Sequence, residues 1–290
     1  MQLLRATTLS LAALAACAHL PPSIDAAAPI PVAADGVHIR HRRVRLAPSH
    51  TKGFEGVLRA CVTGASAAGL DTTWLCYRES PGRYWLVTFA AHDGTFDEPQ
   101  GLEGFVGHAA PAALPDLREL ELEVEWEWEL QQAAAWCTVE AVDIQTHPKA
   151  RLMVRTVRPG REAAFAAALT ARTAFLAEQG YPLPIEGFVT RRGGPAGALQ
   201  VVFPRDWSSF HDADSFRAFV EAMDGPTRVE YDGRKAALMH TMSRAEFHDA
   251  DLVAELSRGA VPTAAAQDTS VVAAGEGVHL VLGHRHPSAE

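Results

Sequence analysis

The chain has 290 residues, of which 48% are hydrophobic and 21% charged, and its formal net charge is -9. This composition excludes a mainly disordered chain, a collagen-like chain and a membrane protein with many spans, and the length predicts one large or two small domains. The negative charge argues against a nucleic-acid partner, and four Cys are too few for a fold held together by disulfides.

The first 16 residues have the pattern of a secretory signal peptide, in which Arg5 supplies the positive charge and Leu9 to Ala16 the apolar segment. The segment Leu14-Ala15-Ala16-Cys17 resembles a bacterial lipobox. This resemblance implies cleavage before Cys17, acyl chains on that residue and stable anchoring to a lipid bilayer. Residues 17–36, rich in Pro and Ala, then form a tether. The alternative is an ordinary secreted protein whose signal peptide happens to contain a Cys.

The region after the tether contains an internal repeat. Four positions recur 111 residues later (165 − 54), and four others recur 114 residues later (203 − 89), in the same order. The pairs are Phe54/Phe165, Leu58/Leu169, Gly69/Gly180, Tyr77/Phe188, Phe89/Phe203, Phe96/Phe210, Phe105/Phe219 and Val106/Val220. One change of spacing in a hairpin loop is compatible with duplication, because loops accept insertions without disturbing the core. We therefore expect two similar domains, residues 37–147 and 148–258, and a flexible tail, residues 259–290.

Both copies have the pattern strand, helix, strand, strand, helix, strand. Apolar residues at helical spacing mark the first helix of each copy, and Gly69 and Gly180 suit its end because glycine accepts a positive φ. Strands are expected at Val37–Leu46, Thr73–Glu79, Tyr84–Ala90 and Leu120–Leu130, and in the second copy at Leu152–Val157, Ile185–Arg191, Ala198–Phe203 and Leu238–Met242. The second helices are expected at Leu102–Ala113 and Asp214–Met223.

The segment Leu120–Leu130 alternates without exception between apolar residues and Glu, which is typical of a strand with one buried face. We expect its acidic row on the solvent face of an edge strand, paired in part with the basic residues of the first strand. The row is Glu121, Glu123, Glu125, Glu127 and Glu129, and the basic residues are Arg40, His41, Arg42, Arg43 and Arg45. The inward side chains are then Leu120, Leu122, Val124, Trp126, Trp128 and Leu130. The alternative places the acidic row inside a barrel, as a site for a cation or a basic ligand.

This order of elements, repeated twice, predicts an α+β fold made of two ferredoxin-like βαββαβ repeats. Over residues 37–250 the chain resembles the dimeric α/β-barrel superfamily, to which the antibiotic-biosynthesis-monooxygenase type belongs. The resemblance implies two sheets packed face to face with the helices outside. Because both repeats are in one chain, it also implies a barrel closed within a monomer.

The resemblance points to three candidate site residues. Monooxygenase-type members have a Trp near the end of the third strand, which makes Trp207 a candidate, with His211 and His240 as the candidate histidines. The alternative is packing by an aromatic residue, and the first copy has Asp93 at the corresponding position. Heme-binding relatives use a proximal His, but neither candidate lies in a motif specific for an axial ligand. No heme, other cofactor or metal is therefore predicted.

Three remaining features are ambiguous. The string Phe-His-Asp-Ala-Asp occurs at residues 210–214 and 247–251, and we expect Asp212 or Asp214 to cap a helix rather than to bind a metal. Cys61, Cys76 and Cys137 allow either a Cys61–Cys76 disulfide or three unpaired thiols. The tail histidines, His279, His284 and His286, are interpreted as incidental rather than as a metal site.

The sequence favours a membrane-anchored envelope lipoprotein whose barrel binds a small apolar ligand without catalysis. Because residue 18 is Ala rather than Asp, the lipobox resemblance implies the periplasmic side of the outer membrane if the cell is Gram-negative. The expected partners are the bilayer, through Cys17, and the ligand. Two alternatives stay open: a cofactor-independent monooxygenase or heme-binding enzyme of the same superfamily, and a structural or interaction protein with a filled barrel.

Overall fold

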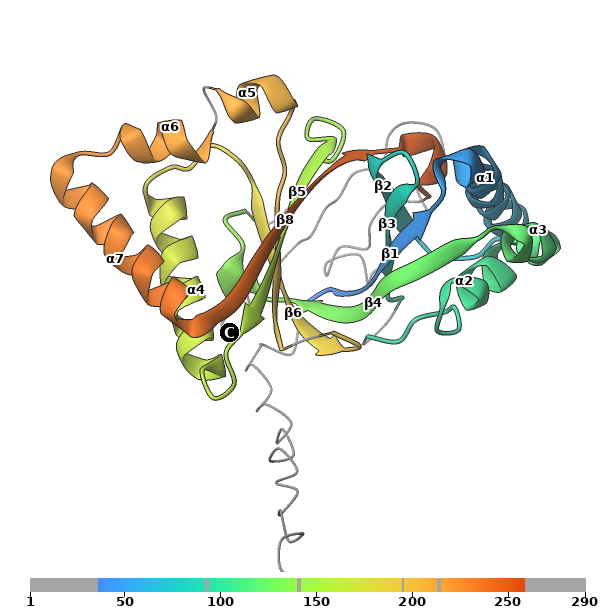
Figure 1. Ribbon diagram of the computed structural model, residues 1–290, viewed down its shortest axis with the longest axis horizontal. Coiled ribbons are helices and arrows are strands. Elements are labelled where there is room, and N and C mark those ends of the chain that lie inside the picture. Colours follow the sequence, from blue (N-terminus) through green and yellow to red (C-terminus); the bar gives the residue numbers. More distant parts are fainter. Residues whose placement is uncertain (1–35, 92–93, 140–141, 195, 213–214, 259–290) are drawn as a thin grey trace, which may run out of the picture.

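The computed structural model describes residues 36–91, 94–139, 142–194, 196–212 and 215–258. Eight antiparallel strands form a closed barrel in the order β1-β3-β2-β8-β5-β7-β6-β4. Each half contributes four strands in the ferredoxin-like order, β4-β1-β3-β2 and β8-β5-β7-β6. The helices lie outside the barrel, α1 to α3 beside the first half and α4 to α7 beside the second (Figure 1). The predicted fold, a tandem dimeric α/β-barrel in one chain, is confirmed.

The elements have the following bounds. The first half contains β1 (His38–Leu46), η1 (Pro48–His50), α1 (Thr51–Ala68), β2 (Trp74–Ser80), β3 (Arg83–Phe89), α2 (Leu102–Ala109), η2 (Pro111–Ala113), α3 (Leu114–Glu119), β4 (Leu122–Gln132) and η3 (Ala134–Trp136). The second contains β5 (Lys149–Val157), α4 (Glu162–Glu178), β6 (Ile185–Arg192), β7 (Gly197–Val202), α5 (Trp207–His211), α6 (Phe216–Glu221), α7 (Gly225–Thr241), β8 (Met242–Leu252) and η4 (Ala254–Leu256). None of the described helices is long and apolar enough to cross a membrane.

The prediction for the last strand was wrong. Asp224 accepts a hydrogen bond from the backbone N–H of Thr227 and starts the additional helix α7, so β8 begins only at Met242. The fourth strands of the two halves are therefore 120 residues apart (242 − 122) instead of 114. His240 lies in the last turn of α7, exposed, and not on a strand.

The helix ends also differ in part from expectation. Gly69 and Gly180 adopt positive φ of 65° and 70° after the first helix of each half, as predicted. The cap of α6 is Ser215, whose hydroxyl accepts from the N–H of Ala218; Asp212 follows α5 instead, and Asp214 lies outside the described residues. The second Phe-His-Asp-Ala-Asp string lies within β8 and caps no helix.

Strand β4 pairs with β1 along nearly its whole length but with β6 only over residues 129–132, so the expected edge position is correct for residues 122–128 and wrong for the end of the strand. A β-bulge at Glu125 interrupts its register with β1, since Arg43 pairs with Trp126 but Val44 pairs with Val124. A bulge adds one residue to a strand, so the two faces of β4 exchange at this point.

The exchange of faces explains why the inward set was only partly correct. Trp126, Trp128 and Leu130 lie in the core cluster inside the barrel. Leu120 and Leu122 instead pack in the outer core, against the helices. Val124 is 37% exposed. A strand without the bulge would have kept all six residues on one face.

The outer face of β1 and β4 carries a network of ion pairs. Arg42, whose side chain is fully buried, lies 3.0 Å from the equally buried Glu98 carboxylate and 3.5 Å from Glu127. Arg40 contacts Glu98 at 3.2 Å and Glu129 at 3.0 Å. The cross-strand pairing expected from the sequence is thus present, but the pairs are shielded by the segment that carries Glu98.

The first half has one continuous outer core between sheet and helices, whereas that of the second half is divided into two clusters. Cys61 and Cys76 belong to the first of these cores, and both are free thiols, as is Cys137. Burial raises the pKa of the Cys61 and Cys137 thiols to about 12, which keeps them protonated.

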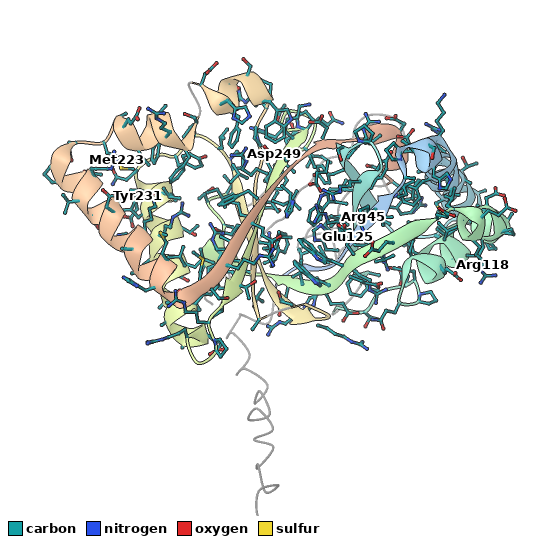
Figure 2. All side chains as sticks on the ribbon, viewed as in Figure 1. Arg45, Arg118, Glu125, Met223, Tyr231 and Asp249 are labelled. Carbon is teal, nitrogen blue, oxygen red and sulfur yellow. The ribbon has the colours of Figure 1, made fainter. Side chains whose placement is uncertain are left out.

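Replacement of Glu98 by Gln should destabilise the fold by about 3–5 kcal/mol, because it leaves Arg42 buried with too little compensating charge. The measurement is the free energy of unfolding in denaturant, followed by tryptophan fluorescence. Glu103→Gln is the matched control, since Glu103 pairs with Arg118 at the exposed surface (Arg118 is labelled in Figure 2), and it should leave the transition unchanged. Equal effects of the two substitutions would contradict the importance of the buried network.

Candidate functional site in the barrel lumen

The lumen, the space enclosed by the eight strands, is largely filled by apolar side chains. Trp126 and Trp128 stack with ring centroids 4.6 Å apart, and Trp85 meets Trp126 edge to face at 5.3 Å. The connection between β4 and β5 adds Val142 and Ile144, both buried. The lumen therefore has a true hydrophobic core rather than an open channel.

A small cavity of about 40 Å³ remains between the two sheets. Its wall is apolar except for three side chains, His41, Tyr77 and Glu186. Space of this size holds roughly one or two water molecules. The apolar wall consists of Ile39, Leu75, Val87, Phe89, Ala150, Leu152, Phe188, Leu199, Val201 and Phe203.

Glu186, on strand β6, is the most unusual group of this wall. It is 1% exposed, and its Oε1 atom has no hydrogen-bond partner. Burial raises the pKa of this carboxyl to about 8, so it is mostly protonated at neutral pH. A neutral carboxyl offers one O–H donor and an acceptor oxygen to whatever occupies the cavity.

His41, on strand β1, faces the same cavity and stacks on Trp85 with ring centroids 4.6 Å apart. Burial, together with the positive Arg43 and with His248, lowers the pKa of His41 to about 3. The imidazole is therefore neutral, and its Nε2 has no hydrogen-bond partner. The cavity thus combines two buried polar groups, both uncharged, with an apolar wall.

A charged cluster lies beside the tryptophans. The Arg43 guanidinium lies over both Trp85 and Trp126, 4.9 Å from each ring centroid, and contacts Glu79 at 2.8 Å. Nδ1 of His248 lies 3.3 Å from Glu79. Burial alone would raise the pKa of Glu79, but hydrogen bonds from His248 and Arg43 hold it at about 2.

Glu125 and Glu246 extend this cluster. Glu125, the bulge residue of β4, lies 3.2 Å from Arg43, and Nε2 of His248 lies 3.5 Å from Glu246. Arg45 also pairs with Glu125, at 3.2 Å, and the two are labelled next to one another in Figure 2. The acidic row of β4 is therefore neither wholly solvated nor wholly inside the barrel, because the bulge divides it.

The internal repeat shows that each of these polar lumen residues is present in only one of the two copies. Glu186 corresponds to Leu75 at the spacing of 111, and His41 corresponds to Leu152 (152 − 41). At the spacing of 120, His248 corresponds to Trp128 (248 − 128). Each polar group thus stands where the other copy has an apolar side chain. Comparison of the two copies was the signal that could have identified these residues from the sequence.

The structure places the predicted candidates outside the lumen. Trp207 is anchored by its indole N–H, which donates to Asp251 at 2.8 Å, and its ring lies 6.1 Å from that of His211. His211 is exposed on α5, and His240 is exposed on α7. Trp207 and His211 are neighbours, but the lumen contains neither of them nor His240.

Heme does not fit the lumen of this chain, because the cavity holds only about one or two water molecules. His41, which faces it, stacks on Trp85 and leaves no room for a macrocycle. Among the described residues there is also no group of three or more His, Cys, Asp or Glu arranged to hold a metal ion.

No protein-family model matches the sequence, and no curated protein is significantly similar to it. A solved anthrone oxidase-like protein is 12% identical, with a TM-score of 0.49 over 77% of this chain and 94% of that chain. A heme-binding protein from Thermus thermophilus is 11% identical, with a TM-score of 0.42 over 79% and 96%. A mutant chlorite dismutase from Candidatus Nitrospira defluvii is 11% identical, with a TM-score of 0.43 over 76% and 92%. These likenesses assign neither activity nor cofactor to this chain, whose fold follows from its own strand order.

Because of Glu186, the wild type should become less stable as pH rises. Glu186→Gln should lack this part of the pH dependence. In the folded chain the pKa of the carboxyl is about 8, and its ordinary value is 4.5. Between these values the folded state binds the additional proton, so wild-type stability falls with increasing pH. Relative to Glu186→Gln, the wild type should lose on the order of 3–5 kcal/mol of unfolding free energy over this range.

Denaturant titrations of both proteins from pH 4.5 to 8 measure this difference. His41 acts in the opposite direction, because its depressed pKa makes stability rise with pH between about 3 and 6.5, but it is present in both proteins and cancels. Glu178→Gln, at the exposed end of α4, should follow the wild type. Parallel profiles for the wild type and Glu186→Gln would contradict a buried, protonated Glu186.

Proposed function

We propose that the protein is an exported, lipid-anchored module of the cell envelope whose barrel binds a small, mostly apolar molecule without catalysis. The ligand carries one hydrogen-bonding group, which is paired by Glu186 in the lumen. Because the cavity of about 40 Å³ is smaller than a benzene ring requires, binding displaces a side chain of its wall. Cys17 carries the anchor, and residues 17–36 connect it to the barrel; both lie outside the described residues, apart from Gly36.

The observation that carries the proposal is the Oε1 atom of Glu186, which no protein group pairs, in an otherwise apolar cavity. A buried polar atom without a partner costs about 1–3 kcal/mol. The equivalent position in the first half is Leu75, so the fold itself does not require a carboxyl there. A ligand that pairs with Glu186 would recover this cost, and the apolar wall selects an otherwise apolar molecule.

The barrel closure supports a monomeric module. Each of the two seams between the halves, β2 with β8 and β4 with β6, is already hydrogen-bonded within the chain. Each half therefore finds a partner for its sheet edges within the same chain, although residues 122–128 of β4 and 243–250 of β8 are paired on one side only. A monomer on a tether is suited to capturing a small molecule near the membrane.

Phenol and toluene are matched probes for this proposal, because they differ by one hydroxyl. In titration calorimetry the wild type should bind phenol more tightly than toluene, with a side chain of the wall displaced to admit the ring. Glu186→Leu, which copies the first half, should weaken phenol binding by roughly tenfold or more and leave toluene binding unchanged or tighter. No difference between the two probes in the wild type would refute the hydrogen-bonding role of Glu186.

Replacement of Cys17 by Ser should release the protein from the membrane fraction, because no acyl chain can be attached to residue 17. Immunoblots of fractionated cells measure the change. Cys137→Ser is the control, since Cys137 is a free thiol of the barrel region and should not affect fractionation. Wild-type-like membrane association of Cys17→Ser would exclude lipidation at this residue as the anchor.

A catalytic alternative is favoured by one observation, the Glu79–His248 pair beside Trp85 and Trp126. A carboxylate that orients an imidazole is the arrangement of a general base. The same phenol experiment separates the two functions. Oxygen-dependent consumption of phenol that is lost in His248→Gln would favour the enzyme, whereas reversible binding without turnover favours the binding module.

A further inference from the structure

The outer core of the second half is interrupted by polar side chains. Met153, Phe175 and their neighbours form one apolar cluster, and Phe165, Leu169 and theirs form another. Four buried polar side chains on β5, α4 and β7 have no part in either cluster: Arg155, Arg172, Thr173 and Gln200. Two of the four are guanidinium groups.

Arg155 lies on the helix-facing side of β5 and is 6% exposed. Its Nη2 atom donates to the sulfur of Met153, and its Nη1 atom has no partner. Burial, together with the positive charge of Arg172, lowers the pKa of Arg155 to about 9. In the described part of the chain no carboxylate forms an ion pair with it.

Arg172, on α4, is 9% exposed and also has an unpartnered Nη1. Its guanidinium lies 5.2 Å from the ring centroid of Phe216. Burial raises the pKa of the Tyr231 phenol, and the nearby positive charge of Arg172 works in the opposite direction. The Tyr231 hydroxyl therefore keeps its proton and can donate it.

The first half has no such charges. Arg155 corresponds to Val44 and Arg172 to Cys61 at the spacing of 111 (155 − 44 and 172 − 61). Both counterparts are fully buried in the continuous apolar core. Two buried cations without a compensating anion are costly, and the fold is built without them in the other copy.

A surface pocket of about 510 Å³ lies directly over this region. Phe216, against which Arg172 lies, lines it together with Tyr231, Phe210 and Val220, whereas Arg155 and Arg172 are not themselves lining residues. Figure 2 labels Tyr231 on α7, on the side that faces the sheet. Of the lining cations, Arg217 pairs with Glu221, Arg228 with Asp232 and Arg151 with the neighbouring Asp249. Lys235 is the one lining cation without an ion pair among the described residues.

We propose that this pocket binds an oxyanion, a carboxylate or phosphate group carried on an apolar body. The apolar body contacts Phe210, Phe216 and Val220. The Tyr231 hydroxyl donates a hydrogen bond to the oxyanion, and the negative charge compensates the two buried guanidinium groups nearby. In a poorly solvated environment this compensation is much stronger than at an exposed surface. The site is separate from the lumen and does not depend on the function proposed for Glu186.

Phenyl phosphate is the test ligand, with benzyl alcohol as its uncharged counterpart and inorganic phosphate as the anion without an apolar body. In titration calorimetry on the full-length protein, phenyl phosphate should bind more tightly than either. The double variant Arg155→Val with Arg172→Met should weaken phenyl phosphate binding by about 30-fold or more. The same variant should melt at an unchanged or higher temperature, because it replaces unpaired buried charges with apolar side chains. A purely structural pair of arginines would give the opposite result, a lower melting temperature.

The control variant, Arg59→Gln with Arg244→Gln, removes two exposed positive charges that do not line the pocket, and should leave binding unchanged. If the buried double variant does not fold, Tyr231→Phe decides, since it removes only the hydroxyl and should weaken phenyl phosphate binding. Wild-type affinity in the folded double variant or in Tyr231→Phe would overturn the proposal. Equal binding of inorganic phosphate and phenyl phosphate would overturn the role of the apolar body.

Discussion

Closure of the barrel is the constraint on which the rest of the structure depends. The two sheets join at seams of unequal length: β2 and β8 share two residue pairs, and β4 and β6 share four. Between the joined sheets His41 and Glu186 are each 1% exposed, whereas Glu79, Glu125 and His248 keep some contact with water. The raised pKa of Glu186 and the lowered pKa of His41 both have this burial as their largest cause. Residues 122–128 of β4 pair with β1 alone, and the glutamates there oppose edge-to-edge association with another chain.

Duplication followed by divergence explains where polar residues are buried. The two halves share their strand order and the helix after the first strand, so an apolar residue at a position in one half shows that the fold does not need a polar residue there. Glu186 in the lumen and Arg155 beneath the helices both depart from that requirement, since their counterparts are Leu75 and Val44. Each departure costs stability in the ligand-free chain. Sites that carry such a cost are the natural candidates for binding, because a ligand can offset it.

The two cavities differ in size and in the charge of their lining residues, so they suit different ligands. The lumen cavity, about 40 Å³, is enclosed by strands and is apolar except at His41, Tyr77 and Glu186. The pocket over Tyr231, about 510 Å³, is bounded by helices of the second half and is rich in cations. A small neutral molecule suits the first and an anion with an apolar part suits the second, because the charge state of the surrounding groups differs.

Local patterns in the sequence were sufficient for the repeat, for most strands and for the charge pairing between β1 and β4. Periodicity depends on residues close together in the chain, and Gly69 and Gly180 mark helix ends by their own backbone freedom. The bulge at Glu125, the late start of β8 after α7 and the convergence of His41, Glu186 and Tyr77 were decided only by tertiary structure. The alternation of Glu and apolar residues in β4 continues unbroken through the bulge, so the sequence pattern does not reveal it. His41, Tyr77 and Glu186 come from three different strands and meet only after the barrel closes. Barrel closure also buries these groups and thereby sets their charge states, so a local sequence pattern cannot predict those charge states.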